Sequence, residues 1–168
     1  KLLSCFREYK PSVIRGNASE IIALAGLWKL DGGTSDSAVR GVDSTDTVAA
    51  ARQAAVALAK FTGGAVAVSG ETDLITDGEI VAYSHGGSKF MEMVTGSGCS
   101  LGGVTAVYAC AADPFIAALT AANIYNLAGK RAESKVQAPG SFQVQFIDEL
   151  YLATPEEVAE NPFALEQA

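Results

Sequence analysis

The sequence is poor in positive charge and has no long apolar run. It has 12 Lys and Arg against 19 Asp and Glu, a formal net charge of −7, and the acidic residues are spread along the chain. A nucleic-acid surface needs clustered Lys and Arg, so we expect no nucleic-acid partner. The apolar stretches, such as 21–27 and 109–112, are far shorter than a membrane span, and no signal peptide opens the chain. We therefore expect a soluble protein that binds no membrane.

Cysteine and histidine are also scarce. The three cysteines, Cys5, Cys99 and Cys110, show neither a CxxC spacing nor an even count, so a zinc site and a disulfide framework are both disfavoured. We expect a reducing compartment, namely the cytoplasm or, in a eukaryote, a plastid or a similar compartment. Cys110 stands among alanines in a predicted helix, and we expect it to be a small buried residue.

Apolar residues make up 49% of the 168 residues and aromatic residues only 8%. This length suits one core, so we predict a single domain over 1–168. The high content of Ala and Gly favours helices that pack closely on a sheet. We therefore predict the α/β class. The chain starts without Met in a segment that is typical of the approach to a core strand, so we expect further sequence upstream.

Local patterns predict most of the helices and strands. In chain order they are a strand at 12–14, a helix from 18 capped by Asn17 and ended by Gly26, a loop at 31–43, a helix to Phe61, a strand at 65–69, a hairpin of 73–76 and 79–84 around Asp77-Gly78, a third strand at 90–94, helices at 99–112 and 115–130, a helix after Ser141, and a short helix after Thr154 followed by a loose end.

A glycine turn, Gly96-Ser97-Gly98, stands directly before a predicted helix. Such a turn leaves N–H groups at the helix N-terminus, where the helix dipole adds partial positive charge, and this suits phosphate oxygens. The turn fails the dinucleotide pattern, because Leu101 takes the third glycine position, and no Gly-Lys-Ser/Thr follows as in a P-loop. By itself, a turn of this kind is as typical of a purely structural connection as of a phosphate-binding site.

Cys99 lies in the first turn of that helix. A thiol at this place has a lowered pKa, and its thiolate can accept a proton. A single cysteine is more commonly a small buried residue, and this alternative stays open. His85, the only histidine, lies in a predicted loop and gives Cys99 no partner, so a cysteine protease is disfavoured.

A second polar group follows the strand at 12–14. Arg15, Asn17 and Glu20 come where a strand ends and a helix begins, at the edge where open α/β sheets bind ligands. Arg binds phosphate, and Glu holds Mg²⁺ directly or through water. Alone, Glu20 would more commonly only complete a capping box with Asn17. Ser69, at the end of the strand at 65–69, offers a hydroxyl to a phosphate.

Five segments together resemble the hydroxyethylthiazole kinase family. In the family's order they are 14–21 (IRGNASEI), 41–44 (GVDS), 68–73 (VSGETD), 95–99 (TGSGC) and 139–143 (PGSFQ). The resemblance implies the ribokinase-like fold, with three α/β/α layers, a mainly parallel sheet and a small hairpin, of which this chain is the C-terminal part. It also implies transfer of a phosphoryl group from ATP, with Mg²⁺, to the hydroxyethyl alcohol of 4-methyl-5-(2-hydroxyethyl)thiazole in thiamine biosynthesis and salvage.

The resemblance assigns roles to residues near the first strand. Arg15 and Ser69 would contact the ATP phosphates, although family members often have Thr in place of the serine. Glu20 would organise Mg²⁺, mainly through water.

It also assigns roles to the glycine turn and the residue after it. Gly96, Ser97 and Gly98 would bind the phosphoryl group in transit, with Gly96 also beside the substrate. Cys99 occupies the place where sugar kinases of the wider superfamily have an Asp base, and it would accept the proton of the alcohol. In phosphoryl transfer such a base contributes less than positioning and electrostatics.

Members of the family resemble one another in forming homotrimers with sites between subunits, and their N-terminal portion is absent from this sequence. We therefore expect little kinase activity from residues 1–168 alone. Two alternatives stay open: a hydroxymethylpyrimidine-type kinase, which lacks the Arg-Gly-Asn-Ala-Ser-Glu string, and an inactive fragment or structural subunit. We assign the segment 31–40 no role.

Overall fold

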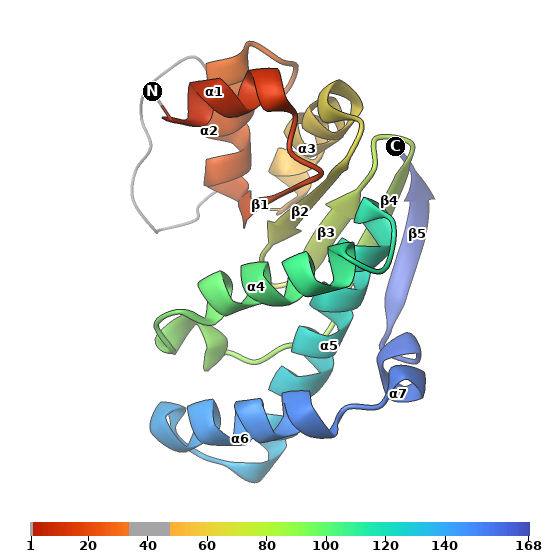
Figure 1. The fold of residues 1–168 in the computed structure, drawn as a ribbon. Helices are drawn as coiled ribbons and strands as arrows, with labels where there is room; N and C mark the ends of the chain where they lie inside the picture. Colours follow the sequence, from red (N-terminus) through yellow and green to blue (C-terminus); the bar gives the residue numbers. More distant parts are fainter. Residues whose placement is uncertain (1, 34–47) are drawn as a thin grey trace. The chain divides into compact units, whose positions relative to one another are not determined.

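The computed structural model describes residues 2–33 and 48–168, which form two compact units (Figure 1). Unit 1 consists of Lys1–Tyr83 with Ala164–Ala168, and unit 2 of Ser84–Phe163. Unit 1 combines helices with strands, as the expected α/β class requires, and unit 2 consists of helices. The single domain over 1–168 stays a prediction, and most of the loop expected at 31–43 lies outside the described residues.

A five-stranded mixed sheet runs through the fold in the order β1-β2-β3-β4-β5. The expected parallel pairing joins β1 and β2, and the antiparallel pairing of β3 with β2 makes the sheet mixed. The hairpin around Asp77-Gly78 forms where we predicted it, because the Asp77 carboxylate accepts hydrogen bonds from the N–H groups of Glu79 and Ile80. The strands are β1 (Val13–Asn17), β2 (Ala65–Ser69), β3 (Asp73–Thr76), β4 (Ile80–Ser84) and β5 (Phe163–Gln167).

A close approach at Gly64 starts the parallel pair. The N–H of Ala65 donates to the carbonyl of Ser12 at 2.9 Å, just before β1. A Cβ on Gly64 would lie 2.3 Å from that carbonyl oxygen, so only glycine lets the two strands begin side by side. The register then pairs Arg15 with Ala67 and Asn17 with Ser69.

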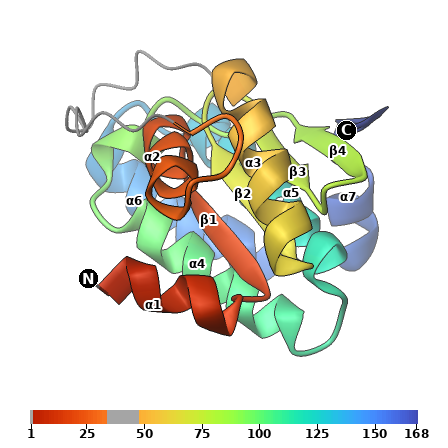
Figure 2. The same ribbon diagram turned by 90° about the horizontal axis from the view of Figure 1, so that it is seen from above.

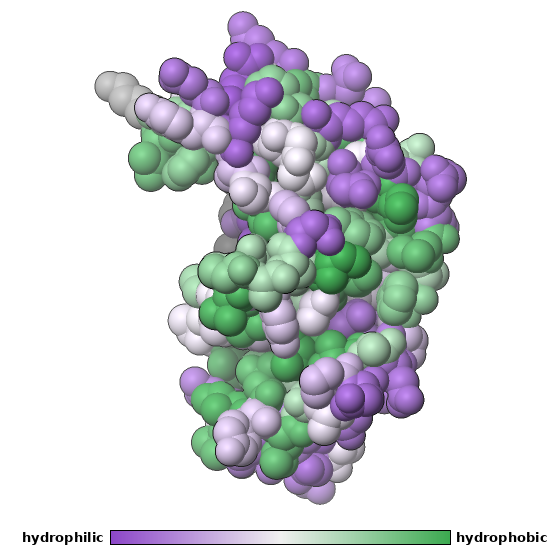
Figure 3. All heavy atoms as spheres, turned by 45° about the vertical axis from the view of Figure 1, so that its right-hand side comes forward, coloured by the Kyte–Doolittle hydropathy of each residue, from purple (hydrophilic) through white to green (hydrophobic). Residues whose placement is uncertain are grey.

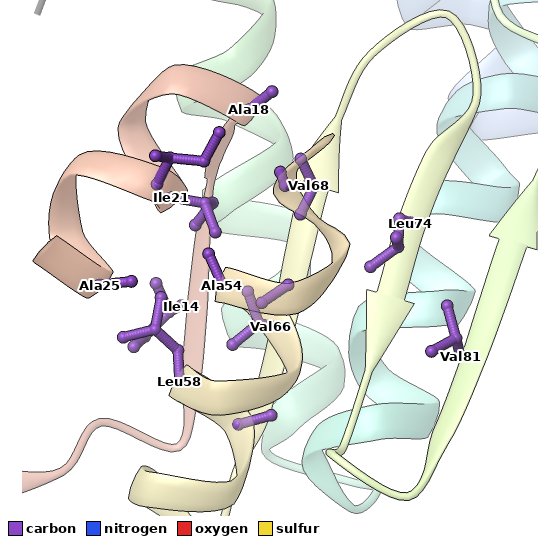
Figure 4. Close-up of a cluster of buried hydrophobic side chains, with 14 of the residues drawn as sticks. Ile14, Ala18, Ile21, Ala25, Ala54, Leu58, Val66, Val68, Leu74 and Val81 are labelled. Atoms are coloured by element: carbon purple, nitrogen blue, oxygen red, sulfur yellow. The ribbon is translucent and has the colours of Figure 1, made fainter. Parts of the chain in front are cut away.

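Helices α2 (Ala18–Trp28) and α3 (Val48–Thr62) cover one face of β1 and β2 (Figure 2). Small residues of these helices, such as Ala25 and Ala54, let the helices approach the strands closely. Figure 4 shows Ile21 and Leu58 among the strand residues that complete this buried core. The core therefore holds the carboxyl ends of β1 and β2 in a fixed place.

Unit 2 is a group of helices around an aromatic core. Phe142 stacks on Phe146 with ring centroids 5.6 Å apart, and Phe90 and Tyr125 pack against this pair. Helices α4 and α6 both pack on α5. The helices are α4 (Ser97–Ala109), α5 (Pro114–Lys135), α6 (Pro139–Leu152) and α7 (Pro155–Ala159), with a 3₁₀ turn at Met91–Met93.

A buried polar network lies at the start of unit 2. The Ser84 hydroxyl donates to the Asn123 side-chain oxygen at 2.7 Å and accepts from the Asn126 amide at 2.9 Å. The Asn161 amide donates to the carbonyl of His85 at 3.0 Å. These bonds tie the segment after β4 to α5 and to the end of α7, and they satisfy polar groups that would be costly to bury alone.

Several sequence-based boundaries are wrong. The first residues form a helix, α1 (Leu2–Tyr9), instead of the approach to a strand. Helix α2 continues past Gly26 because Trp28 is buried, and Lys29 takes the left-handed cap position with its N–H bonded to Ala25 and Gly26. Cys110 is exposed instead of buried, since it stands at the end of α4.

The second half of the chain holds three further corrections. The strand expected at 90–94 is a 3₁₀ turn, because Phe90 and Val94 pack into the aromatic core instead of pairing with a strand. Helix α6 starts at Pro139 with Ala138 as N-cap, so Ser141 does not cap it. The tail expected to be loose forms β5. No helix among residues 2–33 and 48–168 is long and apolar enough to cross a bilayer.

An ion pair fixes α7 to α5. Arg131 donates to both carboxylate oxygens of Glu157, at 2.6 and 3.1 Å. This bidentate bond, and the N–H of Thr154, lower the pKa of Glu157 from the ordinary 4.5 to about 2. The short helix expected after Thr154 is present, and Thr154 and Glu157 form a capping box at its start.

We expect Glu157→Gln to lower the melting temperature near neutral pH. Because the pKa of Glu157 is lower in the folded chain than in the unfolded chain, its ionised form stabilises the fold above pH about 4.5, and that contribution is lost as the pH falls toward 2. The difference in melting temperature between the two proteins should therefore shrink as the pH falls through this range. Glu156→Gln, which removes the same charge one residue away, is the control. A pH-independent difference would contradict the assignment.

Candidate functional site

Arg15 and Ser69 meet at the carboxyl ends of the two parallel strands. Arg15 lies in the middle of β1, and its guanidinium Nη2 donates to the Ser69 Oγ at 2.8 Å. Ser69 is the last residue of β2. Both side chains are half-buried. The bond joins two residues that lie 54 positions apart along the chain.

The N-terminus of α2 lies directly after β1. The Asn17 side chain accepts from the N–H of Glu20 at 2.9 Å, and the Glu20 carboxylate accepts from the N–H of Asn17 at 2.8 Å. The predicted capping box is therefore confirmed. Glu20 is exposed, and its Oε2 is the oxygen that accepts the bond from Asn17. The carboxylate can thus cap the helix and still face a ligand with its other oxygen.

Gly16 is part of this arrangement, although sequence reasoning passed over it. A Cβ at this position would lie 2.9 Å from the Glu20 Oε2 and 3.1 Å from the Glu20 Cβ. Any side chain would therefore push Glu20 away from the strand. A glycine inside a strand often marks a close approach of another group. The predicted strand ended at residue 14, and only the observed extent of β1 places Gly16 inside a strand.

The turn after β2 is built by Asp73. Its carboxylate accepts from the N–H of Gly70 at 3.1 Å. A Cβ on Gly70 would lie 2.4 Å from a methyl group of Val48, the first residue of α3. The segment after Ser69 is thus held against α3, which fixes where the Ser69 hydroxyl lies.

The glycine turn of unit 2 leads into α4 as predicted. Gly96 is the N-cap and has a φ of +91°, a left-handed conformation that favours glycine. The carbonyl of Gly96 accepts from the N–H of Ser100 at 2.9 Å. Ser97 makes two hydrogen bonds to the preceding residues. Its hydroxyl donates to the carbonyl of Met91 at 2.8 Å, and its backbone N–H donates to the carbonyl of Val94 at 3.3 Å.

Cys99 is the third residue of α4 and is exposed. The buried alternative for this thiol is therefore wrong. His85 lies in the loop after β4, as expected, and its carbonyl accepts from Asn161. The structure thus places an exposed cysteine in the first turn of a helix whose N-cap is the left-handed Gly96.

The structure brings the predicted residues together in two groups. Arg15, Glu20 and Ser69 belong to unit 1, and the segment 96–99 belongs to unit 2. Within residues 2–33 and 48–168, no three His, Cys, Asp or Glu side chains form a group that could hold a metal ion by themselves. Any cation near Glu20 would therefore need water or a bound phosphate as further ligands.

Comparison with known proteins gives consistent matches along the chain. A sequence model of the hydroxyethylthiazole kinase family matches residues 2–156. The hydroxyethylthiazole kinase of Bifidobacterium animalis subsp. lactis is 46% identical over 98% of this chain and 58% of that protein. That of Corynebacterium glutamicum is 48% identical over 89% of this chain and 55% of that protein. The chain thus spans a little more than half the length of these relatives.

A solved structure has a similar fold. The hydroxyethylthiazole kinase protein of Pyrococcus horikoshii OT3 matches 96% of this chain and 57% of its own chain, with a TM-score of 0.77 and 23% identity. At this identity the match concerns the fold alone. It agrees with the predicted α/β class and with the ribokinase-like fold that the motifs implied.

The capping box can be tested by substitution. We expect Asn17→Ala to lower the free energy of unfolding by about 1 kcal/mol, because the N–H of Glu20 loses its acceptor at the helix N-terminus. Urea unfolding followed by circular dichroism measures this change. Asn17→Asp, which keeps an acceptor oxygen, should retain most of the stability. Equal losses in both variants would show that the side-chain oxygen is not the stabilising group.

Proposed function

Because this chain belongs to the hydroxyethylthiazole kinase family, we propose that it is the part of a thiazole-alcohol kinase that binds ATP phosphates and supplies the base. The reaction would transfer the γ-phosphoryl group of ATP to the hydroxyethyl alcohol of 4-methyl-5-(2-hydroxyethyl)thiazole. The whole protein would act in thiamine biosynthesis or salvage, in the cytoplasm or another reducing compartment. Its assembly would be a homotrimer with sites between subunits.

The observation that carries this proposal is the Arg15–Ser69 hydrogen bond beside the start of α2. A guanidinium and a hydroxyl are both donors to phosphate oxygens, and they lie at the carboxyl ends of two adjacent parallel strands. The helix N-terminus that follows β1 adds partial positive charge at the same edge. In a chain with a net charge of −7, this local concentration of donors is what an anionic ligand requires.

Glu20 fits a role toward Mg²⁺ that is mainly water-mediated. Magnesium keeps several waters and is usually held by one or two carboxylates together with substrate phosphates, so a single carboxylate is a sufficient protein contribution. One Glu20 oxygen is used by the N–H of Asn17, which fixes the orientation of the other. When bound, the ion would neutralise charge on the phosphates.

The glycine turn of unit 2 would bind the phosphoryl group during transfer. Gly96 is the N-cap of α4, and Ser97 and Gly98 are its first two residues. No side chain caps this helix, so an anion can take the place of the cap. Gly96, which has open space around it, would also lie beside the alcohol. The internal bonds of Ser97 hold the turn in this shape before the ligand arrives.

Cys99 would act as the base. The alcohol oxygen would form a bond to the γ-phosphorus while the bond from this phosphorus to the β-phosphate oxygen breaks, which releases ADP. The proton of the alcohol would pass to the Cys99 thiolate and then to solvent. The exposed position of the sulfur at the first turn of α4 supports this role, because a substrate hydroxyl can reach it.

We predict that Arg15→Met lowers the affinity of residues 1–168 for ATP with Mg²⁺ by about tenfold to a hundredfold, because a hydrogen bond to a charged group contributes roughly 1.5–3 kcal/mol. Ser69→Ala should weaken binding less, and Ser69→Thr, which keeps the hydroxyl, should bind nearly as the original chain does. Arg52→Met, on α3, is the matched control. Isothermal titration calorimetry measures the affinities. Unchanged ATP affinity in both Arg15→Met and Ser69→Ala would contradict the assignment of the phosphate site to β1 and β2.

Turnover tests the base and the substrate together. A hybrid enzyme is made by placing residues 1–168 in the Bifidobacterium animalis relative, in place of the segment that they match. We expect Cys99→Ala to lower kcat by about tenfold or more, Cys99→Asp to restore part of it, and Cys110→Ala, at another exposed cysteine, to change nothing.

The same hybrid distinguishes the two candidate alcohols. We expect a higher kcat/KM with the thiazole alcohol than with hydroxymethylpyrimidine. Preference for the pyrimidine would contradict the thiazole assignment, and full activity of Cys99→Ala would contradict the base assignment. Normal kinase turnover by residues 1–168 alone would contradict the expectation that this chain is insufficient for catalysis.

A further inference from the structure

The segment that leads into the glycine turn lies close against the middle of α5. The N–H of Gly87 donates to the carbonyl of Asn126 at 3.0 Å. A Cβ on Gly129, three residues further along α5, would lie 3.1 Å from the Cα of Gly87 and 3.0 Å from the sulfur of Met91. Both distances are shorter than most contacts of a Cβ atom. The missing side chain of Gly129 therefore lets this segment approach α5.

Gly129 is an unfavourable residue for the helix that contains it. It is buried in the interior of α5, a helix of 22 residues. Glycine destabilises a helix interior relative to alanine, because its backbone loses more conformational freedom on folding. Alanine, which is frequent elsewhere in α5, would suit the helix better but would obstruct the approach of Gly87 and Met91. The close approach of this segment explains why a glycine stands here.

Met91 connects α5 to the glycine turn. Its side chain packs against the aromatic core of unit 2, and its carbonyl accepts the hydroxyl of Ser97 at 2.8 Å. The N–H of Ser97 donates to the carbonyl of Val94, whose side chain also packs against that core. Both donors of Ser97, the residue after Gly96, thus end on residues that the core holds. The place of the turn therefore depends on the place of Met91.

The two methionines of the chain lie in the same 3₁₀ turn but in different surroundings. Large apolar side chains reach the surface in several places (Figure 3), and Met93 is one of them, with 62% of it exposed. Met91 is half-buried, and its sulfur lies beside Gly129. The same residue type thus occurs once in contact with α5 and once at the surface, which provides a matched control.

We propose that Gly129 is a positioning residue for the glycine turn 96–98 and acts on it through Met91 and Ser97. Its importance for the reaction rests on the role in phosphoryl transfer proposed above for this turn. A Cβ at position 129 would shift Met91 and Gly87 by a few tenths of an ångström, and the hydroxyl of Ser97 would carry this shift to the turn. Donors to a transferring phosphoryl group must be placed closely, so a small shift slows the chemical step.

Kinetics of the hybrid enzyme test the consequence for the reaction. We expect Gly129→Ala to lower kcat by about threefold to tenfold. The KM for ATP should change little, because Arg15 and Ser69 would hold the ATP phosphates on other elements. Lys130→Ala, at the exposed neighbouring position, should change neither constant. In a Ser97→Ala background the loss from Gly129→Ala should largely disappear, since the hydroxyl that transmits the shift is gone.

Hydrogen exchange in residues 1–168 tests the connection itself, without turnover. The amides of Ser97 and Ser100 both donate hydrogen bonds within the turn. We expect Gly129→Ala to speed their exchange severalfold, because the shifted segment weakens these bonds. Met91→Ala should have the same effect, and Met93→Ala should have none. Circular dichroism checks that the variants are folded, and Met91→Ala alone suffices for the test if Gly129→Ala does not fold.

Several results would overturn the proposal. One is unchanged exchange at the turn in both variants, and another is an unchanged kcat of the Gly129→Ala hybrid. Equal losses from Gly129→Ala with and without Ser97→Ala would show that position 129 acts by another route. Faster exchange also of the Ala117 amide, which donates to Asp113 at the start of α5, would indicate general loosening of the helix. A hybrid without kinase activity would refute the proposed function, whereas the exchange rates would still decide whether Gly129 positions the turn.

Discussion

The parallel pairing of β1 with β2 is the constraint on which the candidate site depends. Because Gly64 lets the carbonyl of Ser12 accept the N–H of Ala65, the strands run in register from their first residues. That register brings the ends of β1 and β2 to the same edge, where Arg15 can bind Ser69. A shift by one residue would turn Arg15 to the opposite face of the sheet and separate the pair.

Local chemistry determined the parts of the fold that the sequence predicted correctly. Asn17 and Glu20 at a capping-box spacing, and Asp77-Gly78 between two apolar runs, each specify a structure through bonds within a few residues. The same holds for the glycine turn before α4. The α/β class followed from the high content of Ala and Gly, and the resemblance to the family indicated Arg15 and Ser69 as candidate phosphate residues.

Tertiary contacts determined the parts that the sequence missed. Helix α2 passes Gly26 because burial of Trp28 outweighs the preference for a glycine cap. The residues at 90–94 have strand-like composition, but Phe90 packs on Phe142 instead of pairing along a backbone. Cys110 resembles a core residue in its alanine-rich surroundings, and only the place where α4 ends exposes it. No pattern within one segment contains this information.

The network of Ser84, Asn123, Asn126 and Asn161 has a consequence for how this sequence can vary. Each of its bonds has a direction, with the Ser84 hydroxyl donating to one asparagine and accepting from another, so each member fixes the chemical type of its neighbours. A single replacement leaves a buried donor or acceptor without its partner, whereas a concerted change of several members to apolar residues can be tolerated. Substitutions at these distant positions should therefore be strongly epistatic, and an evolutionary path away from this network must pass through destabilised intermediates.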